Sequence, residues 1–200
     1  FMDRTINVGA IPADRALAYG FTGPNLRACG VDYDVRVMNP YCSYEEFDFI
    51  VPVGQNGDTY DRFMVRQEEM WQSLRIIEQA IAKLDAMDDK ETYFAKDPRF
   101  VLPPKEKVYN NMEALIWHFK IVMGETDIPA GEVYHSVEAA NGELGFYLVS
   151  DGGRTASRLH FRRPCFIYYQ AYPEMVKGAM LSDAILTMSS MNVIAGELDA

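Results

Sequence analysis

Residues 60–84 carry the strongest structural pattern in the chain, a stripe of apolar side chains at helical spacing. These side chains recur at steps of mostly three and four residues: Phe63, Met64, Met70, Trp71, Leu74, Ile77, Ile81 and Leu84. Steps of this size place side chains on one side of an α-helix. The pattern predicts an amphipathic helix about 37 Å long at 1.5 Å per residue, and Asp58 is expected to cap its start.

Several shorter segments are also expected to be helical. They cover residues 14–20, 22–30, 110–122 and 173–190. In the first of these, Asp14 is suited to be the N-cap, and Gly20 is suited to end the helix. Glycine and proline interrupt the second, which predicts small helical turns. Residues 31–37 are expected to be extended and residues 40–52 irregular.

The spacing of apolar residues changes to a period of two after residue 131, which is typical of β-strands. The alternating segments are residues 132–139, 143–150 and 157–163. Asn141-Gly142 is a strong signal for a tight hairpin turn, and Asp151-Gly152-Gly153 predicts a second turn. The chain is therefore expected to be mainly α with a small antiparallel β meander, an α+β fold.

The composition excludes several classes of protein. With 200 residues and 48% hydrophobic residues, the chain is suited to an ordinary globular domain. Its formal net charge of −10 argues against nucleic-acid binding, which needs basic surface. No apolar run approaches the roughly 20 residues that span a bilayer, so we expect no transmembrane helix. The start lacks the pattern of a signal peptide, and a first residue of Phe1 indicates a cut fragment.

No familiar catalytic or metal-binding motif is present. Cys29, Cys42 and Cys165 stand far apart, so neither a zinc nor an iron–sulfur site is predicted. Buried, reduced thiols in a cytoplasmic setting are the simplest interpretation. The histidines are expected to be structural: His118, His135 and His160. Neither a dinucleotide-binding fingerprint nor a P-loop occurs, so these patterns alone assign no catalytic residue.

Many longer motifs, in a fixed order, resemble one known family. They are residues 4–12, 16–36, 41–44, 49–54, 57–66, 69–70, 73–79, 112–116, 118–120, 129–134, 137–139, 142–152, 158–166 and 196–199. In these stretches the chain resembles the large catalytic subunit family shared by respiratory complex I and the nickel-iron hydrogenases. The resemblance covers nearly everything outside the divergent connector at residues 86–106.

The C-terminal residues favour the complex I branch of that family. Nickel-iron hydrogenases end in a D-P-C-x-x-C motif, whose two thiolates bind the metal pair. Aligned on the ends, those positions hold Ile194 and Glu197 here. An aliphatic side chain and a carboxylate cannot replace two soft thiolate ligands. The chain therefore looks like the quinone-site subunit of the NADH-quinone oxidoreductases, in which the vacated cavity takes a quinone.

The resemblance implies a fold and a role. Residues 1–200 would be the C-terminal half of such a subunit, an incomplete form of the helical-bundle core typical of hydrogenase large subunits. The family's quinone head-group ligands, a His and a Tyr, belong to the N-terminal half, so the catalytic residues stay unassigned. The family's C-terminal tail lines the quinone cavity. The implied wall residues are Ile194, Gly196, Glu197, Leu198 and Asp199.

Three positions depart from the family's pattern. The tail aspartate is Asn192 here, the final arginine is Ala200, and Thr59 stands where a cysteine is common. These departures bear on quinone chemistry, because a terminal guanidinium would have been a strong partner for a carboxylate. They keep an alternative open: a non-catalytic scaffold or degenerate paralogue that retains the partner-binding fold.

The resemblance also implies cofactors, partners and location. Electrons from NADH would pass through FMN and iron–sulfur clusters in other subunits to a quinone, the substrate, with coupling to proton translocation. No cofactor is expected on this chain, which would be inactive alone. Its partners would be iron–sulfur and membrane-arm subunits, with the chain peripheral on the cytoplasmic side of the plasma membrane. An isolated half should expose an apolar patch on residues 60–84 or 173–190.

Overall fold

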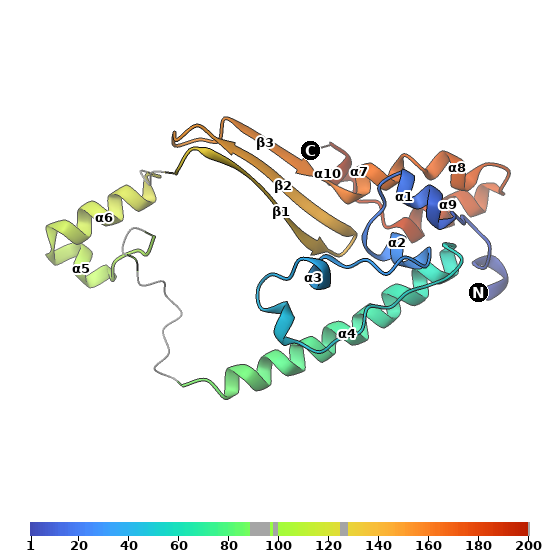
Figure 1. Cartoon of the computed structure of the whole chain (residues 1–200), viewed down its shortest axis with the longest axis horizontal. Helices are drawn as coiled ribbons and strands as arrows, with labels where there is room; N and C mark the ends of the chain where they lie inside the picture. The colour runs from blue at the N-terminus through green and yellow to red at the C-terminus, as the bar shows by residue number, and fades with distance from the viewer. Residues whose placement is uncertain (89–96, 98–99, 125–127, 200) are drawn as a thin grey trace. The chain divides into compact units, whose positions relative to one another are not determined.

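The computed structural model describes residues 1–88, 97, 100–124 and 128–199. Three consecutive strands stand between a first and a last group of helices along the chain (Figure 1). In chain order the elements are η1 (Met2–Arg4), α1 (Ala13–Ala18), α2 (Gly23–Ala28), α3 (Val35–Met38), η2 (Tyr44–Glu46), α4 (Thr59–Asp85), α5 (Lys105–Asn110), α6 (Met112–Val122), β1 (Gly131–Ala139), β2 (Gly142–Ser150), β3 (Arg158–Arg162), α7 (Pro164–Tyr169), α8 (Tyr172–Val176), α9 (Leu181–Met191) and α10 (Ala195–Asp199). The predicted α+β class is confirmed.

The three strands form one antiparallel sheet in the order β1-β2-β3. All three predicted strands are confirmed, with Asn141-Gly142 at the hairpin turn. Gly142 has a φ of +134°, which favours glycine. The hairpin turn packs tightly on α2, because a Cβ on Gly23 would clash with the Gly142 backbone. This contact fixes the turn to the first part of the chain.

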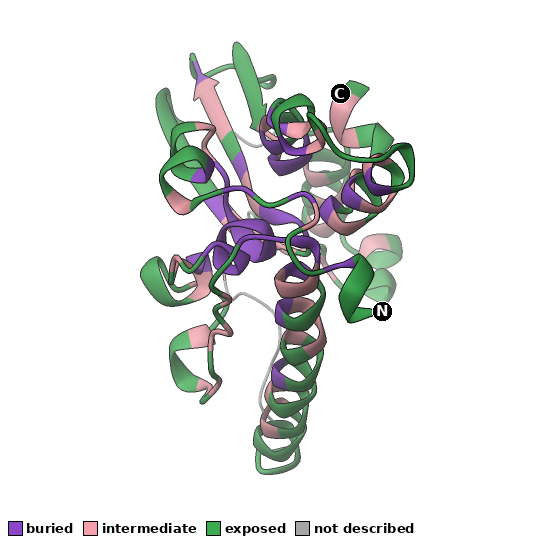
Figure 2. Ribbon diagram, turned by 90° about the vertical axis from the view of Figure 1, so that its right-hand side faces the viewer, coloured by how far each residue is buried: buried purple, intermediate pink, exposed green. Residues whose placement is uncertain are grey.

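The chain divides into two compact units, which we describe separately. The first contains residues 1–84, 135–146 and 161–200, and the second contains residues 85–134 and 147–160. The core of the first unit collects residues from both ends of the chain: Ile11, Ala16, Phe21, Leu26, Cys29, Cys165, Tyr168, Ala171, Met175 and Met191. Every residue of α2 is buried, as its colour in Figure 2 shows.

In the second unit, α5 and α6 pack against each other. Asn111 separates them, and its side chain caps α6 by accepting the N–H of Ala114 at 3.0 Å. The sequence predicted one helix from residue 110, and it missed α5 because α5 begins inside the expected connector. Part of that connector, residues 89–96 and 98–99, lies outside the described residues.

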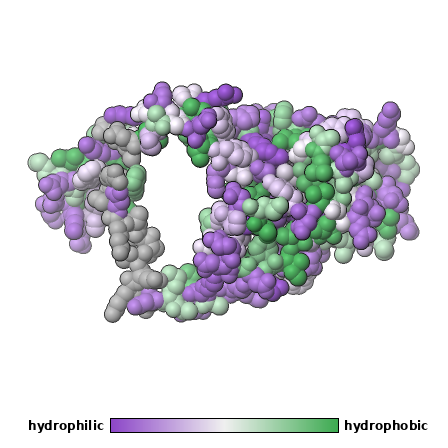
Figure 3. Space-filling view, viewed as in Figure 1, coloured by the Kyte–Doolittle hydropathy of each residue, from purple (hydrophilic) through white to green (hydrophobic). Residues whose placement is uncertain are grey.

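The long helix is confirmed as α4, and Asp58 caps it by accepting the N–H of Asp61 at 2.8 Å. Its apolar stripe, however, is not in the core. Its exposed members are Phe63, Met64, Met70, Trp71, Leu74, Ile77, Ile81 and Leu84. The buried residues of α4 are Thr59, Arg62, Val65 and Gln72. Apolar atoms therefore gather on the surface of the first unit (Figure 3), as predicted for an isolated half.

Two of the predicted helices were wrong in extent. Residues 173–190 are not one helix: α8 ends at Val176, and Gly178, with a φ of +83°, separates it from α9. The exposed apolar residues of α9 include Leu181, Ile185 and Met188, so both predicted faces are exposed. In the first turn of α1, Asp14 lies one residue past the start, because Pro12 is the N-cap.

The segment at residues 31–37 was predicted to be extended, and the second part of it is helical. The Asp34 carboxylate accepts the backbone N–H of Arg36 at 2.9 Å and so begins α3. An aspartate at the N-cap can start a helical turn even where valines favour an extended chain. The irregular segment at residues 40–52 is confirmed apart from the single 3-10 turn η2.

Gly57 offers a test of the packing between the N-terminal segment and α4. Its φ is +63°, and a Cβ there would clash with the carbonyl oxygen of Ile11. Gly178, in the same unit, also has a positive φ but has open space around it. We expect Gly178→Ala to cost about 1 kcal/mol of stability from backbone strain alone, and Gly57→Ala to cost about 1–3 kcal/mol more. Urea unfolding followed by circular dichroism measures both; equal costs would contradict the clash.

Candidate functional site

The candidate site lies where α9 ends. The last carbonyls of a helix have no partner inside the helix, and here other elements supply the donors. Arg66 Nη1, from α4, donates to the Ser190 carbonyl at 2.6 Å. Asn25 Nδ2, from α2, donates to the Met191 carbonyl at 3.2 Å. Asn192 then ends the helix with a φ of 57°. The end of α9 is thus held by α2 and α4.

Arg66 is the charged group of this site. Burial lowers the pKa of its guanidinium, while the carbonyl end of α9 favours a positive charge. Its Nη2 also donates to the Asn25 side chain at 3.2 Å. Its Nε–H is buried and has no acceptor in the described part of the chain. An acceptor oxygen that reached Nε would gain a hydrogen bond without displacing one.

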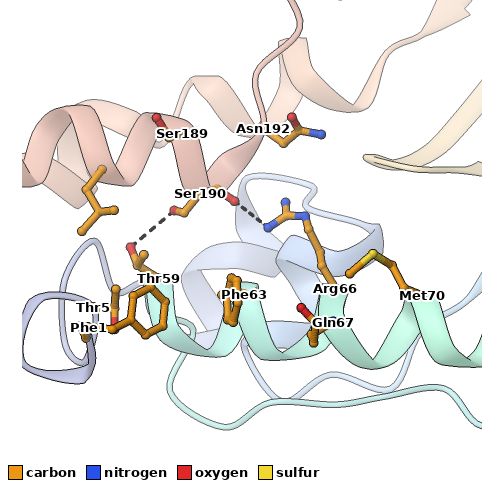
Figure 4. Close-up of a pocket in the computed structure, with 11 residues that line it drawn as sticks. Phe1, Thr5, Thr59, Phe63, Arg66, Gln67, Met70, Ser189, Ser190 and Asn192 are labelled. Carbon is orange, nitrogen blue, oxygen red and sulfur yellow. Dashed lines mark hydrogen bonds between the residues drawn. The ribbon is translucent and has the colours of Figure 1, made fainter.

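A first open groove of about 420 Å³ lies beside this helix end (Figure 4). Its lining residues are Phe1, Thr5, Thr59, Phe63, Arg66, Gln67, Met70, Leu186, Ser189, Ser190 and Asn192. Aromatic and aliphatic side chains form much of the wall, and hydroxyls such as Thr59 and Ser190, 3.3 Å apart, add polar points. A mostly apolar wall with a few polar groups is suited to a flat apolar molecule that carries a small number of polar atoms.

A second open groove, of about 790 Å³, shares part of that wall. It is lined by Arg27, Arg36, Arg66, Glu69, Met70, Ser73, Leu74, Ile77, Glu138, Ala139, Ala140 and Asn192. Arg66, Met70 and Asn192 line both grooves. The second groove differs from the first in its chemistry, because five charged side chains contribute to its wall.

Arg27 is the centre of those charges and is only 1% exposed. Its Nε and Nη2 donate to Glu69 Oε1 at 2.9 and 2.7 Å. Its Nη1 donates to Glu138 Oε1 at 2.8 Å and lies 3.5 Å from Asp34 Oδ2. One guanidinium therefore joins α2 to α3, α4 and β1. A buried arginine with such partners satisfies the rule that buried charges must be paired.

Arg36 completes the cluster by binding Asp34 through two contacts of 3.0 and 2.6 Å. Burial raises the pKa of Asp34, but Arg36 and Arg27 outweigh that effect, so its pKa is lowered. At Glu138 burial is the stronger effect, and its pKa is raised. Three carboxylates thus share two guanidiniums. Glu138 therefore ionises less readily than Asp34.

A further buried arginine, Arg62, holds the start of α4. It donates to the carbonyls of Gly57 at 2.8 Å and of Gly9 at 2.9 Å. Burial lowers its pKa to about 10. The acceptors of these two hydrogen bonds are backbone carbonyl oxygens and not a carboxylate. The N-terminal segment, the turn before α4 and the helix itself are thereby joined at one side chain.

The predicted wall residues form the tail that follows Asn192. Ile194 is 46% exposed, and Gly196 and Asp199 are also exposed. Leu198 packs against the core. Glu197 is half-buried, and its Oε2 accepts the backbone N–H of Cys165 at 2.9 Å. None of the five belongs to the linings of the two grooves, but they begin two residues after Asn192, which lines both.

The arginines of this site were missed at the level of sequence. Arg62, Arg66 and Glu69 on α4 also recur at helical steps of four and three. That second spacing was the available signal that a polar face points inward. No histidine lines either groove. Within the described residues, no group of three or more His, Cys, Asp or Glu could hold a metal ion.

Comparisons with known proteins agree over the whole length of the chain. The family described as respiratory-chain NADH dehydrogenase, 49 Kd subunit, matches residues 1–200. An NADH-quinone oxidoreductase subunit of Cytophaga hutchinsonii is 72% identical over 200 residues, all of this chain and 51% of that protein. The NADH-quinone oxidoreductase subunits of the same type from Flavobacterium psychrophilum and Leptospira biflexa are 69% and 58% identical, with all of this chain and 48% of each protein covered.

The chain therefore spans about half the length of the curated relatives it matches. In the described ranges, no helix has both the length and the apolar character needed to cross a membrane.

The Arg27 cluster can be tested by removing its central charge. We expect Arg27→Gln to lower the free energy of unfolding by about 3–5 kcal/mol, because it leaves buried carboxylates without their partner. Arg75, whose side chain is 45% exposed and pairs with the exposed Asp48, is the matched control. Arg75→Gln should cost less than about 1 kcal/mol. Urea unfolding measures both, and a small loss for Arg27→Gln would show that the cluster does not stabilise the fold.

Glu138 makes a prediction about pH. Its pKa in the folded chain is raised above the ordinary value of 4.5. Between the ordinary pKa and the raised pKa of the folded chain, the folded state binds more protons than the unfolded state. The stability that Glu138 contributes is therefore lost as the pH rises through this range. The stability of the chain relative to Glu138→Gln should therefore fall from pH 4.5 upward. Urea unfolding of both proteins in steps of pH measures this difference, and a rising difference would contradict the raised pKa.

Proposed function

Since the chain belongs to the family of respiratory-chain NADH dehydrogenase 49 kDa subunits, we propose that it serves as part of a core subunit of a proton-translocating NADH-quinone oxidoreductase. In this role its C-terminal tail forms part of the wall of the quinone-binding cavity. The observation that carries the proposal is the match along the whole chain to NADH-quinone oxidoreductase relatives, at up to 72% identity. The chain would be the C-terminal half of that subunit.

The chemistry of the tail supports this role. A quinone is flat and apolar and carries two carbonyl oxygens, so its site needs an apolar wall with a few aimed polar groups. Ile194, exposed beside the helix end, supplies apolar surface. Gly196 adds no side chain, and Asp199 supplies a carboxylate. The carboxylate of Glu197 accepts the backbone N–H of Cys165 and so holds the tail in place. The wall would exclude water from the quinone, while electrons arrive from outside this chain.

The first groove, which Asn192 also lines, supports the same interpretation. Phe63, Met70 and Leu186 give it an apolar lining, and Arg66 adds a charged side chain. These side chains suit the same class of ligand as the tail. Asn192 connects the two surfaces because it lines the groove and precedes the tail.

The remaining parts of the machinery belong to partners in this proposal. NADH, FMN and iron–sulfur clusters would be bound by other subunits, and the membrane arm would carry the proton translocation. The chain would be peripheral to the membrane on its cytoplasmic side. Its own residues contribute binding and positioning, and a flavin or cluster supplies the redox chemistry when its subunit is assembled.

The exposed apolar side chains of α4 and α9 fit a subunit in assembly. The apolar stripe from Phe63 to Leu84 on α4, whose members are all 44% exposed or more, is far longer than the scattered apolar residues of an ordinary surface. Continuous rows of this kind mark surfaces that another chain or segment covers. The half of the relatives' length that this chain does not match is the natural source of that cover.

Ile194 provides the test of the proposed wall. In membranes whose NADH-quinone oxidoreductase carries this chain, we expect Ile194→Asp to raise the quinone KM at least about tenfold, because a carboxylate in an apolar wall is costly to desolvate. Ile50, which is 60% exposed and outside both groove linings, is the control. Ile50→Asp should leave the KM within about twofold.

The same membranes are assayed with an artificial electron acceptor that bypasses the quinone. That activity should persist in both variants, which shows that the complex assembles. An unchanged quinone KM in an assembled Ile194→Asp enzyme would contradict the wall. Full quinone reduction in an enzyme that lacks the whole tail would favour a scaffold role instead.

A further inference from the structure

Four residues of the first unit form a closed ring of hydrogen bonds through their side chains and one backbone carbonyl. Asn192 Nδ2 donates to Asn141 Oδ1 at 2.6 Å, and Asn141 Nδ2 lies 3.4 Å from Cys165 Sγ. Cys165 Sγ and the Tyr168 hydroxyl are 2.9 Å apart. The Tyr168 hydroxyl then donates to the Asn192 carbonyl at 3.2 Å, which closes the ring.

The Asn192 carbonyl is shared by two donors of the ring. The Tyr168 hydroxyl lies 3.2 Å from it and the Cys165 thiol 3.8 Å from it. Either Cys165 or Tyr168 can therefore donate in the contact between them. Asn141 accepts from Asn192 and donates to Cys165. Cys165 and Tyr168 are 0% exposed and Asn141 is 2% exposed, whereas Asn192 is exposed. Polar atoms of the three buried members that lose a partner in the ring are therefore costly to leave unpaired.

The ring joins three parts of the fold to the start of the tail. Asn141 lies in the β1–β2 turn, Cys165 and Tyr168 belong to α7, and Asn192 follows α9. The hairpin turn is itself anchored, because the N–H of Glu143 donates to Thr22 Oγ1 at 3.0 Å. The ring thus connects the residue before the tail to a fixed point of the fold.

Glu197 provides a second anchor from the far side of the tail. Its carboxylate accepts the backbone N–H of Cys165, and the adjacent Leu198 packs against the core. Cys165 therefore meets the tail twice, with its side chain through the ring and with its backbone through Glu197. Between these anchors, Ile194 and Gly196 stay exposed.

We propose that the Asn192–Asn141–Cys165–Tyr168 ring and the Glu197–Cys165 hydrogen bond together form a clasp that positions residues 194–199, with Asn192 and Glu197 as positioning residues. Its functional meaning rests on the proposed function, in which this tail is a cavity wall. The clasp holds the backbone on both sides of Ile194, so that the exposed side chain keeps one orientation. Glu197 then acts on the tail through Cys165 and does not contact the ligand.

The three cysteines allow a test with internal controls. Cys42 is exposed, Cys29 is buried in the core and bonds the carbonyl of Asn25, which is outside the clasp, and Cys165 is buried within the clasp. The purified chain is reacted with iodoacetamide, and the rate at each cysteine is measured by mass spectrometry. Cys42 reports the activity of the reagent, Cys29 reports global unfolding, and Cys165 reports opening of the clasp.

Two variants open the clasp in different ways. Asn192→Asp keeps the shape but removes the donor to Asn141, and Glu197→Ala removes the acceptor of the Cys165 N–H. We expect each to speed the labelling of Cys165 about tenfold while Cys29 stays unchanged. A carboxylate added at 192 and one removed at 197 change the ionisation of the thiol in opposite directions. A faster reaction in both variants therefore reports exposure.

Matched variants complete the design. Asn39→Asp, at an exposed position, should change nothing. Glu197→Gln should restore nearly the original Cys165 rate, because its amide oxygen still accepts the N–H. Unchanged labelling of Cys165 in Asn192→Asp and Glu197→Ala would overturn the clasp, and so would an equal rise at Cys29 and Cys165.

Quinone kinetics in the assembled enzyme separate this inference from the proposed function. With both correct, Asn192→Asp and Glu197→Ala raise the quinone KM while kcat changes little, and Glu197→Gln restores the KM. Faster Cys165 labelling with an unchanged KM would support the clasp and count against the tail as a cavity wall.

Discussion

The pairing of Arg27 with three carboxylates is the interaction on which the rest of the first unit depends. Its partners come from α3, α4 and β1, elements far apart in the sequence. A buried guanidinium is costly without such partners, so these elements must come together for the chain to fold. Arg62 and Arg66 extend the same principle along α4, where buried arginines bind the carbonyls of neighbouring segments. Buried arginines join α4 to its unit in addition to the apolar contact of the buried Val65.

This arrangement explains which features could be predicted from the sequence. The α4 helix and the three strands follow from local spacing, and local spacing is visible in a sequence. The Arg27 cluster is not visible, because nothing near Arg27 or Glu138 indicates that they meet. The break at Gly178 was missed because a glycine in a helical pattern is compatible with close packing as well as with a break. The assignment of the tail came from resemblance and not from any local pattern.

The distribution of apolar residues on α4 is the reverse of that on an ordinary surface helix. Its polar face is buried against the unit and its apolar face is exposed. The chain spans about half the length of its relatives. Under the proposed function, the polar contacts lie within this chain, whereas the apolar stripe would form an interface with the rest of the subunit. The helix would then be a boundary between two parts of a larger core.

Arg66, Met70 and Asn192 belong to both grooves, and this shared wall has a thermodynamic consequence. A molecule that reoriented Arg66 from one side would change the surface presented on the other. The two grooves would then be energetically linked, and linkage between two binding equilibria is reciprocal: each occupant would alter the affinity for the other by the same factor. Two ligands at this helix end would behave as one coupled pair, with a cooperativity whose sign depends on the orientation of a single guanidinium.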